Sequence, residues 1–519
     1  MPQPANPPEE PYFLLGDRLH QAWKLYPDTL DSFATTVILT KSEPSGFQIL
    51  GKTTEDGLWS TVAAPSRLYS TPSKELPLAG MRVSVKDNFC LKGIKTTQSN
   101  RAFVDTYGPE TETAAYLKKL INLGAVIVGK TKLCAFASSE EATDQWIDFH
   151  PPFNPRADGY QSPSGSTSGG ATSLAGYQWL DFSIGTDTSG SVRWPAAWNG
   201  LFGLRVTTNA TSLDGVYAAC RKMDTVGLLS RDLSSLHDFA QHTIEKTSGD
   251  IKTFPKRLLY STDFFPHSNK IQQTIVEEYV TVLENFLDVK RIEFIIADRW
   301  AQCPPAEAEG KPLKEFLNKT AFNPFYWDGY HEFDQFREDH ETKFGKKVYV
   351  GPYMRWKWEM GASVTEDEVK QSLGEWAVYE QWFHDTIFQE DPECGSTAVM
   401  VLPCGTSAPK YRDDPNSPPG IVPAFSPNYI ASMIGLPQLV LPIGQFPYES
   451  RVSGRVEYLP AVGTLVGAKG SDLMLVNLAK AALEDAKWPT EVLTGRFTFK
   501  PGEGSRNVAH LDNTGPSHL

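Results

Sequence analysis

Residues 185–191 (GTDTSGS) end in Ser191, the strongest candidate for a nucleophile in this sequence. They follow a second segment of small residues, 162–170 (SPSGSTSGG). Glycine lets a chain turn tightly, so that a serine hydroxyl reaches a pocket surface with backbone N–H groups pointing to the same spot. Such converging donors stabilise an oxyanion, as acyl transfer to a serine requires. The pattern therefore indicates acyl-transfer chemistry at Ser191.

Lys86 is the candidate base for this serine. A serine hydroxyl is a weak nucleophile until a base takes its proton, and a lysine can take it when burial keeps the amine neutral. Lys86 follows Val83 and Val85 in a pattern typical of a buried strand. A carboxylate facing the amine would oppose neutrality, so we expect the neighbouring Asp87 to point away. Taken alone, Lys-Asp-Asn is also typical of a strand that ends in a polar turn.

Three pieces of the chain resemble, in this order, the amidase signature family of serine hydrolases. They are Lys86 after its Val-rich strand, the loop 164–170, and the run 185–193. The family carries a Gly-Gly-Ser-Ser-Gly-Gly loop at the second place and Gly-Thr-Asp-x-Gly-Gly-Ser-x-Arg at the third. The resemblance extends from about residue 76 to about residue 484. It implies an α/β fold, a large mixed β-sheet core surrounded by helices, and neither a metal nor a cofactor.

The resemblance also implies roles for single residues. Ser191 is the nucleophile and Lys86 is the base, while Arg193 and Asp187 hold the loop by ion pairing. In the family, a serine on a cis peptide bond relays the proton between nucleophile and lysine. The residues expected to bind the substrate and its oxyanion are Ser168, Thr188, Ser189 and Gly190.

The relay loop of this chain departs from the family pattern. When the loop is aligned on Gly169 and Gly170, Thr167 takes the relay position and Ser168 that of the second serine. Threonine keeps a hydroxyl that can donate and accept, so Thr167 is the predicted relay. Two alternatives stay open: Ser166 or Ser168 relays the proton instead, or the altered loop weakens the site. Ser189 likewise stands where the family has a glycine.

These features predict an amidase that hydrolyses a carboxamide of a small molecule through an acyl-enzyme. Two alternatives remain: transfer of the acyl group to an amine at the same site, or an amidase-like scaffold without catalysis. Lys and Arg number 49 and Asp and Glu 62, which gives a net charge of −13. An acidic chain argues against a nucleic-acid partner.

Other expectations concern location and assembly. We find no apolar run near the roughly 20 residues that span a bilayer, so we expect no membrane span and an intracellular, soluble, cytoplasmic protein. The ending Ser517-His518-Leu519 resembles the Ser-Lys-Leu peroxisomal signal, which leaves peroxisomal import open. A homodimer is also left open.

The chain divides into an appended N-terminal region of unknown role (1–73), an amidase signature domain (74–500) and a flexible tail (501–519). In the first region, 36–40 and 47–50 alternate like strands. In the second, the pattern predicts strands over 81–85, 125–128 and 434–444, and helices over 111–122 and 472–484. A helix that leads into a buried strand is typical of α/β proteins.

Residues 124–131 (GAVIVGKT) match the Walker A pattern letter for letter. A P-loop needs a glycine-rich loop after a strand, so that backbone N–H groups wrap a phosphate. Here the variable positions read as the strand itself. The match therefore does not indicate a nucleotide site.

Aromatic residues crowd the segment 323–360. They could line a pocket for an aromatic or lipophilic acyl group. They could equally form core packing, which is the commoner role of such clusters.

Overall fold

The structure is a computed structural model. It describes residues 12–39, 46–68, 70–138, 145–245, 247, 251, 253–405, 408–415, 419–421 and 423–501. The C-terminal Ser517-His518-Leu519 lies outside the described residues. No helix in the described ranges is long and apolar enough to cross a membrane.

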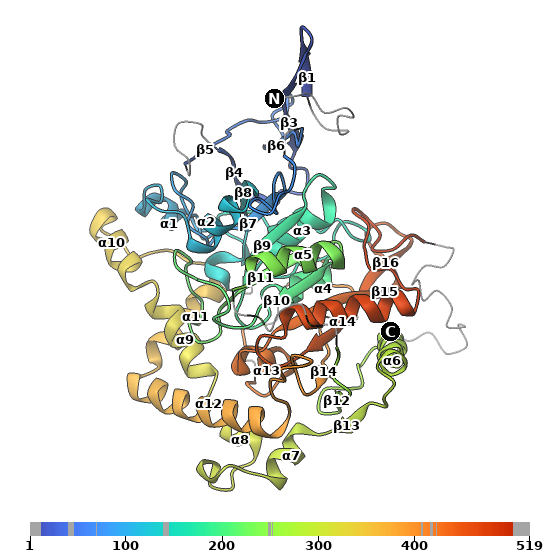
Figure 1. Cartoon of the computed structure of the whole chain (residues 1–519). Coiled ribbons are helices and arrows are strands. Elements are labelled where there is room, and N and C mark those ends of the chain that lie inside the picture. Colours follow the sequence, from blue (N-terminus) through green and yellow to red (C-terminus); the bar gives the residue numbers. More distant parts are fainter. Residues whose placement is uncertain are drawn as a thin grey trace.

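A mixed β-sheet of twelve strands runs through the molecule (Figure 1). Its strand order is β13-β12-β14-β16-β15-β10-β11-β9-β7-β8-β4-β5. Pairing is parallel where β12 meets β13 and β14 and where β7 meets β8 and β9, and antiparallel at the other junctions. The sheet confirms the predicted α/β fold with a large mixed core. Its strands are β4 (Phe33–Leu39), β5 (Phe47–Ile49), β7 (Arg82–Lys86), β8 (Val126–Thr131), β9 (Phe182–Asp187), β10 (Phe202–Arg205), β11 (Thr225–Ser230), β12 (Leu258–Ser261), β13 (Ile292–Phe294), β14 (Val399–Val401), β15 (Gln438–Glu449) and β16 (Val456–Val466).

Helices cover both faces of this sheet. Because side chains alternate along a strand, neighbouring residues of β9 show which helices lie on which face. Gly185 lies against Thr167 and Val192, on the face of α3 and α4, whereas Phe182 stacks on Phe239 of α5 on the opposite face. Helix α14 packs against α5 and α6. These helices are α3 (Ser168–Gly176), α4 (Arg193–Trp198), α5 (Leu233–Thr243), α6 (Lys270–Leu287) and α14 (Asp472–Asp485).

A separate group of helices lies at the lower and left part of the view in Figure 1. Their buried side chains form two apolar clusters of their own, one around Trp300 and Trp376 and the other around Phe103, Phe333 and Trp358. These helices are α1 (Arg101–Thr106), α7 (Ile296–Gln302), α8 (Leu313–Phe316), α9 (Phe322–His331), α10 (Asp334–Phe344), α11 (Pro352–Ser363), α12 (Glu366–Thr386) and α13 (Pro427–Ile434).

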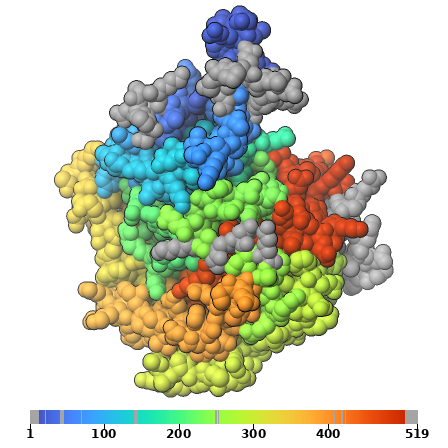
Figure 2. All heavy atoms as spheres, in the orientation of Figure 1, coloured from blue at the N-terminus to red at the C-terminus, as the bar shows by residue number. Residues whose placement is uncertain are grey.

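The N-terminal residues build two small two-stranded sheets as well as part of the main one. The hairpin of β1 (Tyr12–Leu15) and β2 (Arg18–Gln21) protrudes at the top of Figures 1 and 2. Strand β3 (Trp23–Pro27) pairs with β6 (Thr61–Pro65). Strand β4, however, pairs with β8. Residues 33–49 therefore extend the central sheet, although the region 1–73 was expected to be appended to it.

The strongest sequence patterns produced the expected elements. The helix expected over 111–122 is α2 (Ala115–Asn122), which begins later than predicted, and the one over 472–484 is α14. The strand over 81–85 is β7. Residues 434–444 divide between the end of α13 and the start of β15. The Walker-like residues lie in β8, inside the sheet, so their backbone groups serve strand pairing, as expected.

Candidate active site

The site lies where two adjacent parallel strands end. Strands β7 and β9 pair in parallel, and Lys86 is the last residue of β7 while Asp187 is the last of β9. Parallel strands present their carboxyl ends at one edge of a sheet, where open α/β sheets bind ligands. The loop after β9 carries Ser191 and leads directly into α4. The topology therefore brings the predicted base and the predicted nucleophile to the same edge.

Lys86 is fully buried. Its Nζ donates to Ser166 Oγ at 2.8 Å, to Thr186 Oγ1 at 3.0 Å and to the Thr186 carbonyl at 3.4 Å. Burial lowers the pKa of Lys86 to about 8, while the nearby Cys134, Asp224 and Asp187 oppose this shift. A substantial fraction of Lys86 is therefore neutral near physiological pH, as a base must be.

The carboxylate of Asp87 points away from Lys86, as expected. Asp87 Oδ1 lies 2.7 Å from Nζ of Lys130, in an ion pair between two fully buried side chains. Its Oδ2 accepts hydrogen bonds from the backbone N–H and the hydroxyl of Thr97. The strand-ending carboxylate thus belongs to a neighbouring polar network on β8.

The hydroxyl that meets Lys86 is that of Ser166, which corrects the placement of Thr167. The Thr167 side chain packs on Gly185 of β9, and its Oγ1 is buried without a hydrogen-bond partner among the described residues. The cis peptide bond of this loop joins Gly165 to Ser166, one residue earlier than predicted. Alignment on Gly165, the glycine before the serines, would have identified Ser166.

Ser168 also lies elsewhere than predicted. It is the first residue of α3, and its hydroxyl donates to the Ser164 carbonyl at 2.6 Å. Its Oγ lies 3.6 Å from the Cys134 sulfur. Ser168 therefore closes the turn before α3, and its hydroxyl serves the protein's own structure.

Asp187 holds the loop that carries Ser191. Its fully buried carboxylate accepts from the backbone N–H groups of Gly190 at 3.2 Å and Val192 at 3.0 Å. Arg193 and Arg205 pair with the same carboxylate at 2.8 and 2.9 Å. Burial alone would raise the pKa of Asp187, but the two guanidinium groups hold that pKa well below its usual range. The predicted Asp187–Arg193 ion pair is thus present, and it fixes the shape of the loop.

The same contacts narrow the choice of oxyanion donors. The N–H of Gly190 is committed to Asp187, whereas those of Thr188, Ser189 and Ser191 donate to no acceptor in the part of the chain that the structure describes. Gly190 has φ +133°, and a Cβ there would collide with Trp194. The loop therefore needs glycine at 190 but tolerates the side chain of Ser189.

Two side chains that the sequence did not point to complete this loop. The Thr188 hydroxyl donates to Asp224 at 2.5 Å. Tyr429 of α13 is buried, which raises the pKa of its phenol, and a hydrogen bond with Ser189 partly offsets that rise. The sequence signal for Asp224 was its place just before a buried strand. Tyr429 lies more than 200 residues from the loop and carried no local signal.

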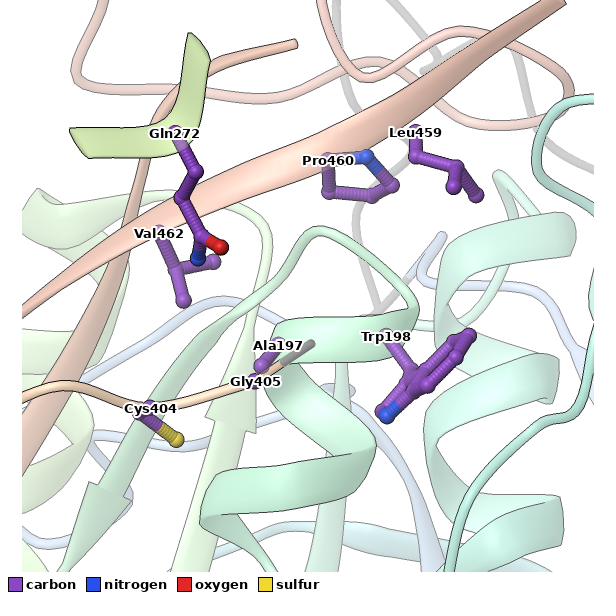
Figure 3. Close-up of a pocket in the computed structure, with 8 residues that line it drawn as sticks. All are labelled: Ala197, Trp198, Gln272, Cys404, Gly405, Leu459, Pro460 and Val462. Atoms are coloured by element: carbon purple, nitrogen blue, oxygen red, sulfur yellow. The ribbon is translucent and has the colours of Figure 1, made fainter. Parts of the chain in front are cut away.

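Many of the aromatic residues of 323–360 serve packing. Phe325 and Tyr326 belong to one apolar cluster, and Phe333 and Trp358 to another. A cavity of about 10 Å³, behind α4, is lined in part by Gln272, Cys404 and Val462 (Figure 3). It holds none of the predicted site residues. Among the described residues, no group of three or more His, Cys, Asp or Glu side chains could hold a metal ion.

Known proteins share this region and this fold. Residues 52–278 match the family model described as Amidase. Amidase 1 of Oryza sativa subsp. japonica is 39% identical over 165 residues, which cover 32% of this chain and 37% of that protein. One component of the glutamyl-tRNA(Gln) amidotransferase of Synechococcus sp. (strain CC9311) is 36% identical over 165 residues, 32% of this chain and 33% of the relative. The chain thus matches about a third of the length of these relatives.

The allophanate hydrolase structure of Kluyveromyces lactis has a similar fold, with a TM-score of 0.64 and 21% identity. The match covers 83% of this chain and 66% of that one. Lys86, Ser166, Ser191 and Asp224 all lie within the matched residues 52–278. Through this region the chain belongs to the amidase family.

Proposed function

We propose that this chain hydrolyses a carboxamide of a small molecule, with Ser191 as nucleophile and Lys86 as base. The observation that carries the proposal is the hydrogen bond of a buried lysine to a serine hydroxyl, at the edge of the sheet where the Asp187-anchored loop presents Ser191. Membership of the amidase family supports it. Ser191 is only 5% exposed, so the reacting amide must enter a narrow site.

The proposed reaction begins with attack of Ser191 Oγ on the amide carbonyl carbon. The Ser191 proton passes to Ser166 Oγ while Ser166 gives its own proton to neutral Lys86. The N–H groups of Thr188, Ser189 and Ser191 stabilise the oxyanion. The C–N bond then breaks, the leaving amine takes the proton back from Lys86 through Ser166, and an ester to Ser191 remains. Water cleaves this ester by the same route.

Ser166 is the proposed relay because it is the hydroxyl that Lys86 contacts. The Thr167 N–H donates to the Ser191 carbonyl at 3.1 Å, so the backbone of the relay loop is joined to that of the nucleophile loop. Thr167 thus contributes to the site through its backbone and through its packing on Gly185.

A fluorophosphonate probe tests the proposed nucleophile. We expect the native protein to become covalently labelled, with the adduct on the peptide that contains Ser191, because the probe reacts with activated serines. Labelling is measured by intact-mass spectrometry and peptide mapping, with heat-denatured protein as the control. A native protein that stays unlabelled at high probe concentration would favour a non-catalytic scaffold.

A pair of variants in the relay loop distinguishes Ser166 from Thr167. Ser166→Ala is expected to slow labelling about 10²-fold, because it removes the hydroxyl between base and nucleophile. Thr167→Val should label at nearly the native rate, because its hydroxyl has no partner among the described residues. Second-order labelling rates of both variants decide the assignment. The reverse order of effects would return the relay to Thr167.

A further inference from the structure

Asp224 faces the nucleophile loop from the neighbouring strand. It directly precedes β11, which pairs with β9 so that Thr225 lies opposite Asp187. In an antiparallel pair this register places the residue before Thr225 beside the residue after Asp187, which is Thr188. Asp224 is 4% exposed. It is therefore a buried carboxylate next to the turn that leads to Ser191.

The carboxylate of Asp224 joins two segments of the site. Its Oδ1 accepts from the Thr188 hydroxyl at 2.5 Å, and its Oδ2 accepts from the N–H groups of Ala219 and Cys220 at 2.8 and 3.1 Å. These donors come from the nucleophile loop and from the segment just before β11. Because a buried acceptor bound by several donors is costly to disturb, Asp224 fixes the two segments relative to each other.

The charge of Asp224 has no direct counter-ion in the described part of the chain, in contrast to that of Asp187. Burial raises the pKa of Asp224 to about 6, and the hydrogen bonds from Thr188, Ala219 and Cys220, together with the charge of Lys86, oppose that rise. Arg205 is a further nearby charge. At pH 7 and above, Asp224 is therefore mostly ionised and faces Lys86 across the site.

We infer that Asp224 is a positioning residue of the proposed amide-hydrolysing site, which holds Thr188 in the nucleophile loop and sets the electrostatic environment of Lys86. This inference rests on the proposed function. It adds a role for the loop position Thr188, whose side chain anchors the loop while its backbone N–H faces the oxyanion.

The electrostatic part of the inference has a direct consequence. The groups that raise the pKa of Lys86 against the effect of burial are Cys134, Asp224 and Asp187. Removing the charge of Asp224 removes one of these contributions, so the pKa of Lys86 should fall. The labelling rate depends on neutral Lys86, and its midpoint should therefore move to lower pH. A purely structural carboxylate would not shift this midpoint.

The test compares Asp224→Asn with a matched variant, Asp472→Asn. Asp472 is also fully buried, accepts from the Thr207 N–H at 2.8 Å and hydroxyl at 2.6 Å, and burial raises its pKa to about 6. It is not among the groups that shift the pKa of Lys86. Fluorophosphonate labelling rates are measured from pH 6 to 9.5, and thermal unfolding reports the stability of each protein.

We expect Asp224→Asn to lower the plateau rate about tenfold, as loss of a charge-assisted hydrogen bond does, and to shift the midpoint to lower pH. Asp472→Asn should keep the native midpoint and plateau. Thr188→Val should lower the plateau without moving the midpoint, because the charge of Asp224 remains, and Thr188→Ser should restore the rate.

Different outcomes separate the possible failures. If the native protein is not labelled, the proposed function fails. If the native protein is labelled but Asp224→Asn matches Asp472→Asn in plateau and midpoint, the role of Asp224 is wrong. Should Asp224→Asn not fold, Thr188→Val decides the matter, because a native labelling rate in that variant overturns the positioning role.

Discussion

Ser191→Ala is expected to abolish covalent labelling and to lower the rate of amide hydrolysis by roughly 10⁵- to 10⁶-fold, the scale seen when a serine hydrolase loses its nucleophile. The substitution removes only an oxygen from a residue that is 5% exposed. The loop should keep its shape, because Asp187 holds it through the backbone of Gly190 and Val192. Probe labelling and release of amine from a panel of small carboxamides measure the effect.

Ser183→Ala is a suitable control for this experiment. Ser183 lies on β9, a few residues before the nucleophile loop, and its hydroxyl is buried without a partner among the described residues. We expect the control to retain the native labelling rate. An adduct on the Ser191→Ala variant, at Ser189 or at another serine, would show that the nucleophile has been misassigned.

Lys86→Met is expected to slow labelling by about 10²- to 10⁴-fold, the usual contribution of a general base. The sign of the accompanying pH dependence follows from burial, which lowers the pKa of Lys86 to about 8. Protonated Lys86 cannot accept the proton, so the native rate should rise about tenfold per pH unit below pH 8 and level off above it. In Lys86→Met this rise should vanish. Rates from pH 6 to 9.5 measure both effects.

Lys130→Met is the matched control for the loss of a buried lysine. Lys130 lies on the adjacent strand β8 and pairs with Asp87 at 2.7 Å. Its removal leaves Asp87 buried without its cation and should lower the free energy of unfolding by about 3–5 kcal/mol. The fraction that stays folded should still show the rise through pH 8. Loss of that rise in Lys130→Met as well would mean that the pH dependence does not report Lys86.

Regular elements and their ends could be predicted from the sequence. The alternation of Val83 and Val85 before Lys86 is a property of a strand, and the strand fixes where Lys86 points. The same holds for residues 125–128, whose continuous apolar run produced β8. Parallel pairing of β7 with β9 then brings Lys86 toward the loop of Ser191. Lys86 and Asp187 therefore lie at the same edge of the sheet, as the motifs implied.

The relay loop could not be predicted with the same accuracy. Between Ser162 and Ser168 there is no repeating backbone geometry, so the direction of each side chain depends on single torsion angles. Alignment on Gly169 rather than on Gly165 shifts the assignment by one residue, from Ser166 to Thr167. The contacts of Asp224 and Tyr429 depend on strand register and on helix packing across the fold, which local sequence patterns do not encode.

The helices grouped around Trp300, Trp376 and Trp358 lie outside the residues 52–278 that match the family model. Lys86, Ser166, Ser191 and Asp224 lie inside that stretch, whereas Tyr429, which reaches Ser189, comes from α13. The reacting groups and part of the wall that faces them are thus encoded in different stretches of the chain. Changes in α9 to α13 can alter the molecules that are admitted while the strands that perform the reaction keep their sequence. One catalytic framework can in this way be fitted to new substrates by exchanging its helical surroundings.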